Sequence, residues 1–72
     1  FSDSAYFPDN SKITMGDATT PDLEIYHSGS HSFIKDNGTG DLKIQGGADV
    51  VIESTAGANS AVFNTDGSVE LY

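Results

Sequence analysis

Apolar residues recur at every second position in several short stretches of this chain. Five triplets have the form apolar, variable, apolar, and in four of them the middle residue is polar or charged. Such alternation places the outer two side chains on one face of a β-strand and the middle one on the other. The triplets are residues 13–15, 23–25, 42–44, 50–52 and 69–71. They predict short strands that bury one face only.

The remainder of the pattern gives no helix signal. No window carries apolar residues at the i, i+3, i+4, i+7 spacing, and Gly, Ser, Thr and Asn interrupt every stretch. Asn or Asp followed by Gly readily adopts the positive φ angles that tight turns need. We therefore predict an all-β chain, with turn positions at Asn37, Gly38, Gly40, Asp66 and Gly67.

The expected strands recur as a three-stranded unit of about 28 residues, a length typical of repeat proteins. An Asp followed by an apolar-rich triplet begins at Asp22 and again at Asp49, and the second strand is a short apolar pair at residues 33–34 and 62–63. Units of this size cannot bury their own apolar faces and depend on neighbouring units. We assign one fibrous repeat region over residues 1–72, with a partial unit (5–15), a clear unit (22–44) and a degenerate unit (49–72).

The clear unit contains three expected strands separated by Ser/Gly and Asn/Gly turns. They cover residues 23–26, 32–35 and 42–44. The sequence starts at Phe1 without an initiator Met and stops at Tyr72 within an expected strand. We therefore expect the 72 residues to be a fragment of a longer chain.

Large apolar side chains are scarce for a chain of this length. Seventeen of the 72 residues are Val, Ile, Leu, Met or Phe, and no Cys is present to form a disulfide. Small domains usually compensate for a small core with disulfides, a metal or partner chains. We therefore expect copies of the chain to associate. Core packing is expected at Phe7, Ile13, Met15, Leu23, Ile25, Ile34, Leu42, Ile44, Val50, Ile52, Phe63, Val69 and Leu71.

The charge of the chain argues against nucleic acid as a partner. Eleven acidic residues face three Lys, which gives a formal net charge of −8. Such a surface repels a phosphate backbone, and Lys12, Lys35 and Lys43 are scattered along the sequence. In addition, no apolar run approaches the roughly 20 residues of a membrane span. We expect neither nucleic-acid binding nor membrane insertion.

The residues of the clear unit also form a longer pattern. It comprises Asp22, Leu23, Ile25, Tyr26, His27, Gly29, Ser30, Ser32, Ile34, Asp36, Gly38, Thr39, Gly40, Leu42 and Ile44. This pattern resembles a repeat found in structural and tail-fibre proteins of tailed bacteriophages, especially marine phages that infect cyanobacteria. The repeat commonly has Asp after the His, whereas this chain has Ser28.

The resemblance implies an elongated, intertwined homotrimeric fibre of the triple β-helix or β-prism type. It implies a structural shaft segment of a tail fibre, a rigid rod that presents a host-receptor-binding tip on the outside of a virion. The expected partners are other copies of the chain, other tail-fibre segments and a host glycan or receptor. We expect no enzymatic activity and no cofactor, apart from a metal considered next.

His27 and His31 are the only His residues, and they flank the expected turn Ser28-Gly29-Ser30. If they pointed inward, a trimer would bring three copies of each near its axis, where imidazoles can hold a transition metal. These two residues are the candidate metal ligands. In the alternative interpretation, His27 hydrogen-bonds a neighbouring backbone group or a Tyr, and His31 faces solvent.

Other interpretations of the sequence stay open. Asp22 and Glu24 would share one side of a strand, as a catalytic carboxylate pair or a Ca²⁺ site requires. Strands this short imply no cleft, however, and Asp at the start of a strand often serves local hydrogen bonding. The remaining alternatives are a glycan- or receptor-binding module that uses exposed Tyr and Asp, a self-assembling extracellular β filament, and a monomeric β-sandwich.

Overall fold

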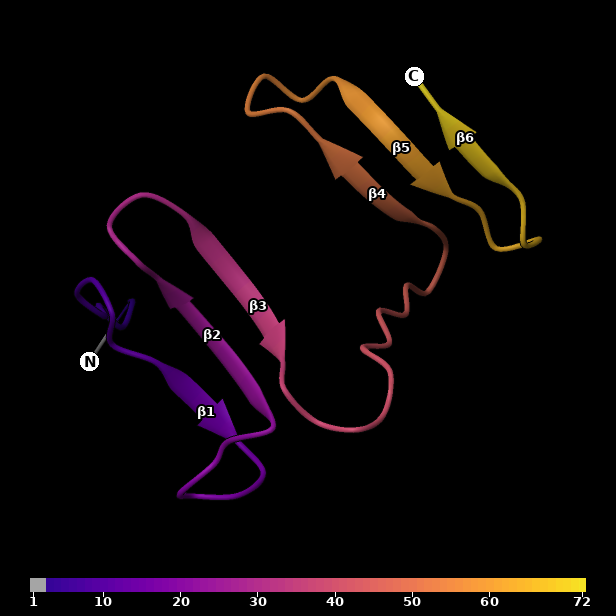
Figure 1. The fold of residues 1–72 in the computed structure, drawn as a ribbon. Helices are drawn as coiled ribbons and strands as arrows, with labels where there is room; N and C mark the ends of the chain where they lie inside the picture. Colours follow the sequence, from indigo (N-terminus) through magenta and orange to yellow (C-terminus); the bar gives the residue numbers. More distant parts are fainter. Residues whose placement is uncertain (1–2) are drawn as a thin grey trace. The chain divides into compact units, whose positions relative to one another are not determined.

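The computed structural model describes residues 3–72, which form six β-strands in two antiparallel sheets (Figure 1). No helix is present in this range, and hence none that is long and apolar enough to cross a membrane. The all-β prediction is confirmed. The chain divides after Leu42 into two compact units, each of which contains one sheet.

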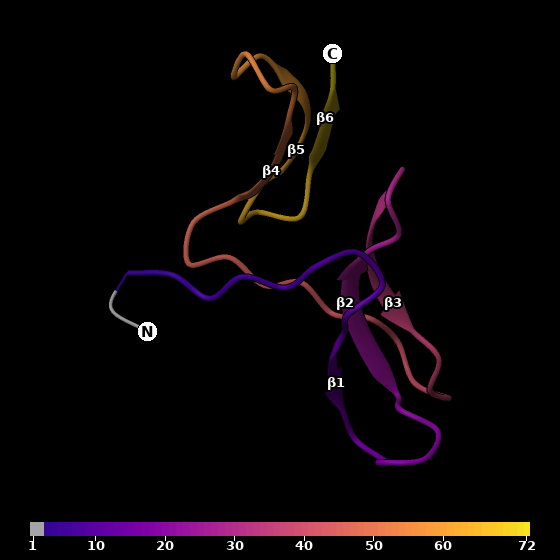
Figure 2. The ribbon, with the colours of Figure 1, turned by 90° about the vertical axis from the view of Figure 1, so that its left-hand side faces the viewer.

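Sheet A is a meander of three strands, β1 (Ile13–Met15), β2 (Leu23–His27) and β3 (Ser32–Asp36). The strands pair in the order β1-β2-β3, with every pair antiparallel. Consecutive strands are therefore neighbours, as expected for hairpins joined by short connections. Figure 2, turned by 90°, shows that the three strands form a single layer.

Sheet B repeats this arrangement with β4 (Val50–Glu53), β5 (Asn59–Phe63) and β6 (Val69–Leu71). Its order is β4-β5-β6, again antiparallel throughout. The pairing of β4 with β5 is irregular between Ile52 and Glu53, where the register shifts. The expected strands at residues 50–52, 62–63 and 69–71 are thus confirmed.

Two hairpin turns in sheet B are closed by their own backbone. Between β4 and β5, the Ser54 amide donates to the Ala58 carbonyl and the Gly57 amide donates to the Ser54 carbonyl, both at 2.9 Å. Between β5 and β6, the Asn64 amide donates to the Ser68 carbonyl at 2.9 Å, and the following turn has a φ of 93° at residue 67. The predicted turn at residues 66–67 is confirmed, and its Gly adopts the conformation that favours Gly.

The prediction of a third strand at residues 42–44 is wrong, because these residues form no strand. The third strand of sheet A is instead β1, which comes from the preceding partial unit and pairs with β2. The local cause lies just after β3. There the Asn37 amide donates to the Asp22 carbonyl at 2.7 Å, and the Gly38 amide donates to Asp36 Oδ1 at 2.8 Å. The chain is tied to the start of β2 and does not turn back along β3.

Burial within one chain is slight. Among the described residues, the buried side chains are Ala61, Val62 and Glu24. None of the thirteen expected core positions is buried, and Ile34 and Leu71 are 60% and 80% exposed. A three-stranded layer leaves a face uncovered unless something packs on it. The expected core is therefore not a core of the single chain, and core packing stays a prediction about associated copies.

Candidate interaction surface

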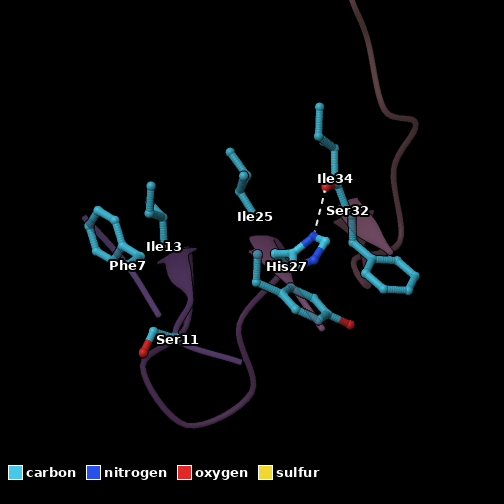
Figure 3. A pocket seen from close by; sticks show the side chains of 9 residues that line it. Phe7, Ser11, Ile13, Ile25, His27, Ser32 and Ile34 are labelled. Atoms are coloured by element: carbon cyan, nitrogen blue, oxygen red, sulfur yellow. Dashed lines mark hydrogen bonds between the residues drawn. The ribbon is translucent and has the colours of Figure 1, made fainter. Parts of the chain in front are cut away.

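One face of sheet A carries a straight line of three isoleucines, here called the isoleucine row. Ile13 of β1 lies opposite Ile25 of β2, and Ile25 lies opposite Ile34 of β3. Directly opposed residues in antiparallel strands point to the same face and touch across the sheet. The three side chains project in the same direction (Figure 3), and they are 43%, 37% and 60% exposed.

An open hollow of about 560 Å³ lies over the isoleucine row. Phe7 stands beside Ile13 at one end, while His27 and Ser32 stand at the other (Figure 3). Phe7 precedes a tight turn in which the amide of residue 11 donates to the Pro8 carbonyl at 3.0 Å. The hollow is broad and mainly apolar, which suits contact with another apolar surface better than capture of a small polar ligand.

Sheet B also has an apolar surface, here called the apolar face of sheet B. Two cross-strand rows build it, and all six residues in them are apolar. The rows are Val50, Phe63 and Val69, and Ile52, Ala61 and Leu71. Ala61 is buried between its neighbours, whereas Ile52 is 53% exposed. No polar side chain interrupts these two rows.

The opposite face of sheet A is held together by contacts within the chain. Lys12 Nζ lies 3.2 Å from Glu24 Oε2, and the same ammonium lies 4.7 Å from the centre of the Tyr26 ring. Tyr26 stacks on Phe33 with ring centres 4.9 Å apart. The side-chain amide of Asn37 donates to Glu24 Oε1 at 3.2 Å. This group, the Glu24 cluster, satisfies its own charges and hydrogen bonds.

The contacts of the Glu24 cluster lower the pKa of the Glu24 carboxylate. The hydrogen bond from Lys12 holds the pKa of Glu24 below its usual value, burial opposes this shift, and the Asn37 side chain adds to it. Asp22, considered above as its partner in a carboxylate pair, does not share this environment. The Asp22 carbonyl accepts from the Asn37 amide and its own amide donates to the Met15 carbonyl at 3.1 Å, so its backbone fastens the strand ends.

The two His residues have different neighbours. His27 Nδ1 is 3.0 Å from Ser32 Oγ, directly across the β2–β3 pair. The His31 ring instead meets the Phe33 ring edge to face, with centres 6.3 Å apart. His27 alternates with Tyr26 along β2 and Ser32 alternates with Phe33 along β3, so His27 and Ser32 share the face of the isoleucine row. His31 turns toward the Tyr26–Phe33 side.

No group of three or more His, Cys, Asp or Glu is placed to hold a metal in the described part of one chain. A metal on a trimer axis draws one ring from each copy, so the single chain does not test it. The metal at His27 or His31 therefore stays a prediction. Because His27 and His31 lie toward opposite faces of the hairpin, such a metal would use only one of the two residues from each copy.

Sequence reasoning missed the contact between His27 and Ser32. The signal was present, since the two residues stand symmetrically about the turn at residues 28–31, where the Ser28 amide donates to the His31 carbonyl. A Ser beside a His acts as a nucleophile beside its base only when a third group orients the His. Here the pair serves as a cross-strand hydrogen bond at the rim of the hollow.

The described residues of both sheets offer apolar area for contact. Each sheet presents exposed apolar rows, and the polar groups of the Glu24 cluster are engaged with one another on the other side of sheet A. Comparisons of the chain with protein-family models, with curated proteins and with solved structures returned no match.

Proposed function

We propose that this chain is a structural shaft segment of a phage tail fibre, in which three copies associate into a rigid rod that presents a receptor-binding tip. The observation that carries the proposal is the exposure of the cross-strand apolar rows. Large, ordered apolar surfaces on a small chain mark contact with other protein surfaces. The similarity of residues 22–44 to the tail-fibre repeat supplies the specific assembly.

The arrangement of the rows supports self-association in particular. The isoleucine row and the two rows of sheet B each lie on one face of their sheet, so copies that pack with these faces inward share a common core. The formal net charge of −8 keeps such an assembly soluble. An interlocked rod resists unfolding because strands of several copies must separate together, which makes unfolding slow.

Light scattering coupled to size exclusion tests the proposal directly. A trimer has a mass three times 7.5 kDa, about 22 kDa, whereas an unassociated chain stays at 7.5 kDa. We expect the trimer, and we expect it to persist in SDS without boiling. A 7.5 kDa species overturns the proposal, and visible open-ended polymers favour a self-assembling filament instead. Binding of the monomer to a glycan array favours a receptor-binding module.

A further inference from the structure

The segment at residues 42–44 (Leu-Lys-Ile), here called the bridging segment, has the sequence of a strand but no strand partner. No backbone hydrogen bond involves it among the described residues. Its two apolar side chains, Leu42 and Ile44, are 45% and 63% exposed. Both segments that match it in the repeat, β1 (Ile-Thr-Met) and β6 (Val-Glu-Leu), are paired edge strands.

Each sheet has one edge without a third strand where the equivalent edge of the other sheet has one. In sheet A an alternating triplet, β1, covers the edge of β2, and in sheet B another, β6, covers the edge of β5. In the repeat, β4 corresponds to β2 and β3 corresponds to β5. The edges of β4 and β3 have no strand beside them. An uncovered edge exposes unpaired N–H and C=O groups that accept another strand.

The edge of β3 is a poor match for the bridging segment. If the bridging segment paired with β3 in the register that β6 has with β5, each residue number would be lower by about 27, the length of the repeat. Lys43 would then lie opposite Lys35, and Leu42 would lie opposite Asp36. Like charges directly opposite one another destabilise a strand pair, and an aspartate offers nothing to an apolar neighbour. The third pair is apolar, so two of the three pairs are unfavourable at this edge.

The edge of β4 is a good match. The pairing of β1 with β2, moved forward along the repeat, sets Leu42 opposite Ile52 and Ile44 opposite Val50. Each row of the apolar face of sheet B then gains a fourth apolar residue. On the other face, Lys43 lies opposite residue 51. Its diagonal neighbours are the acidic residues at positions 49 and 53, whose charge is opposite to that of Lys43. The apolar pairs and the charges both favour this edge.

We propose that the bridging segment of one copy pairs antiparallel with β4 of a neighbouring copy. Within one chain, the connection to β4 bends sharply at Gly46, where an added Cβ would overlap the Asp49 carbonyl, yet residues 42–44 are not paired with β4. Each copy therefore offers one free segment and one free edge. Such a contact runs head to tail, and three copies close it into a ring. This inference rests on the proposed trimer.

Cysteine cross-linking in this Cys-free chain tests the register. The double variant Leu42→Cys/Ile52→Cys places two thiols directly opposite each other only in the proposed pairing, within the Cα separation that a disulfide allows. After oxidation, denaturing electrophoresis without reductant is expected to show a covalent trimer of about 22 kDa, three times 7.5 kDa, which reductant returns to 7.5 kDa. A mixture of the two single-Cys chains, refolded together, is expected to give a covalent dimer.

The matched control is Lys43→Cys/Ile52→Cys, in which the two thiols face opposite sides of the sheet, so no cross-link is expected. Because Ile44 also lines a hollow with Val50 and Phe63 of its own unit, pairing within one chain is the rival outcome. A disulfide-bonded species at 7.5 kDa in the double variant overturns the proposal. Free thiols in a trimer also overturn it, while the proposed function stands.

The unaltered chain provides a second measurement that does not depend on a variant folding. In the trimer, at least one amide among residues 42–44 is expected to exchange at least about tenfold more slowly than the Gly47 amide, because an edge strand donates every second amide to its partner. Equally fast exchange at both places in a trimer contradicts the pairing. A chain that light scattering shows to be a monomer removes both this inference and the proposed function.

Discussion

Sheet A and sheet B have the same number of strands and the same meander, yet different contacts hold them. In sheet A the buried residue is Glu24, which is bound by Lys12 and Asn37. In sheet B the buried residues are Ala61 and Val62, and the described residues there show no ion pair or aromatic pair. The same strand topology is thus compatible with two sources of stability.

The two sheets differ in whether the contacts that stabilise them lie within the same unit. The Glu24 cluster fixes one face of sheet A from within, because its charges and rings have partners in the same unit. Sheet B has apolar residues on both faces, with Val51 and Val62 opposed on the side away from its apolar face. The stability of such a sheet depends on other protein surfaces that cover its apolar faces. We therefore expect association to stabilise sheet B more than sheet A.

The largest effect on association is expected from a charge placed on the apolar face of sheet B. Ile52→Asp puts a carboxylate where copies are proposed to pack, and burying an unpaired charge costs about 3 kcal/mol or more. We expect the trimer to be lost by light scattering. Ser60→Asp is the matched control, since this residue of the adjacent strand β5 is exposed and alternates with Ala61, so it faces the other side. A trimer that tolerates Ile52→Asp as well as the control contradicts the proposed packing.

A second test reduces the isoleucine row of sheet A. Ile25→Ala removes the middle side chain, which is 37% exposed in one chain. If copies cover the row, unfolding should become easier by about 2 kcal/mol per chain, the lower end of the range for buried Ile→Ala. Urea unfolding of the trimer measures this change. A difference below about 0.5 kcal/mol shows that the row stays in solvent.

A third test compares equivalent turns that follow the second strand of each repeat. Gly67 has a φ of 93°, whereas Gly40, its counterpart after β3, does not have a positive φ. Gly67→Ala is expected to cost about 1 kcal/mol, because a side chain disfavours that conformation. Gly40→Ala should cost nothing, since no atom lies within 4 Å of the added Cβ. Equal effects in thermal unfolding contradict this difference.

The smallest expected effect concerns the pH dependence of sheet A. The folded chain lowers the pKa of Glu24 from its ordinary value of 4.5, so its contribution to stability is present above that pH. It is lost as the pH falls through the lowered pKa. Glu24→Gln should therefore flatten the loss of stability below about pH 5, measured by urea midpoints. Asp66→Asn is the comparison in sheet B, where hydrogen bonds from Ser68 lower the pKa of Asp66.

Much of the fold follows from the period of the apolar residues. Alternation located four of the six strands because one face of each is apolar while the intervening positions are mostly polar. The second strand of each repeat was expected from a short apolar pair. In β5 the pair at residues 62–63 extends to Asn59–Phe63. Its early residues are polar or small, and they are recruited by pairing with β4, which no local pattern signals.

The error at residues 42–44 has a different origin. Their alternation is as regular as that of β6, yet pairing requires the preceding turn to close. After β5 the sequence Thr-Asp-Gly-Ser closes it, with Asp66 Oδ1 accepting from the Ser68 amide at 2.9 Å. After β3 the side chain of Asn37 is engaged with Glu24 instead. The Glu24 cluster joins residues far apart in sequence, so a pattern of apolar positions does not reveal it.

The turn between β4 and β5 has a practical consequence. It is closed by bonds between Ser54, Gly57 and Ala58, and nothing lies within 4 Å of a Cβ added at Gly57. No residue of this tip belongs to either row of the apolar face of sheet B. A peptide inserted after Thr55 should lengthen this loop and leave the strand register unchanged. Repeated copies of such a unit would display foreign peptides at regular intervals, which makes this tip a natural grafting point.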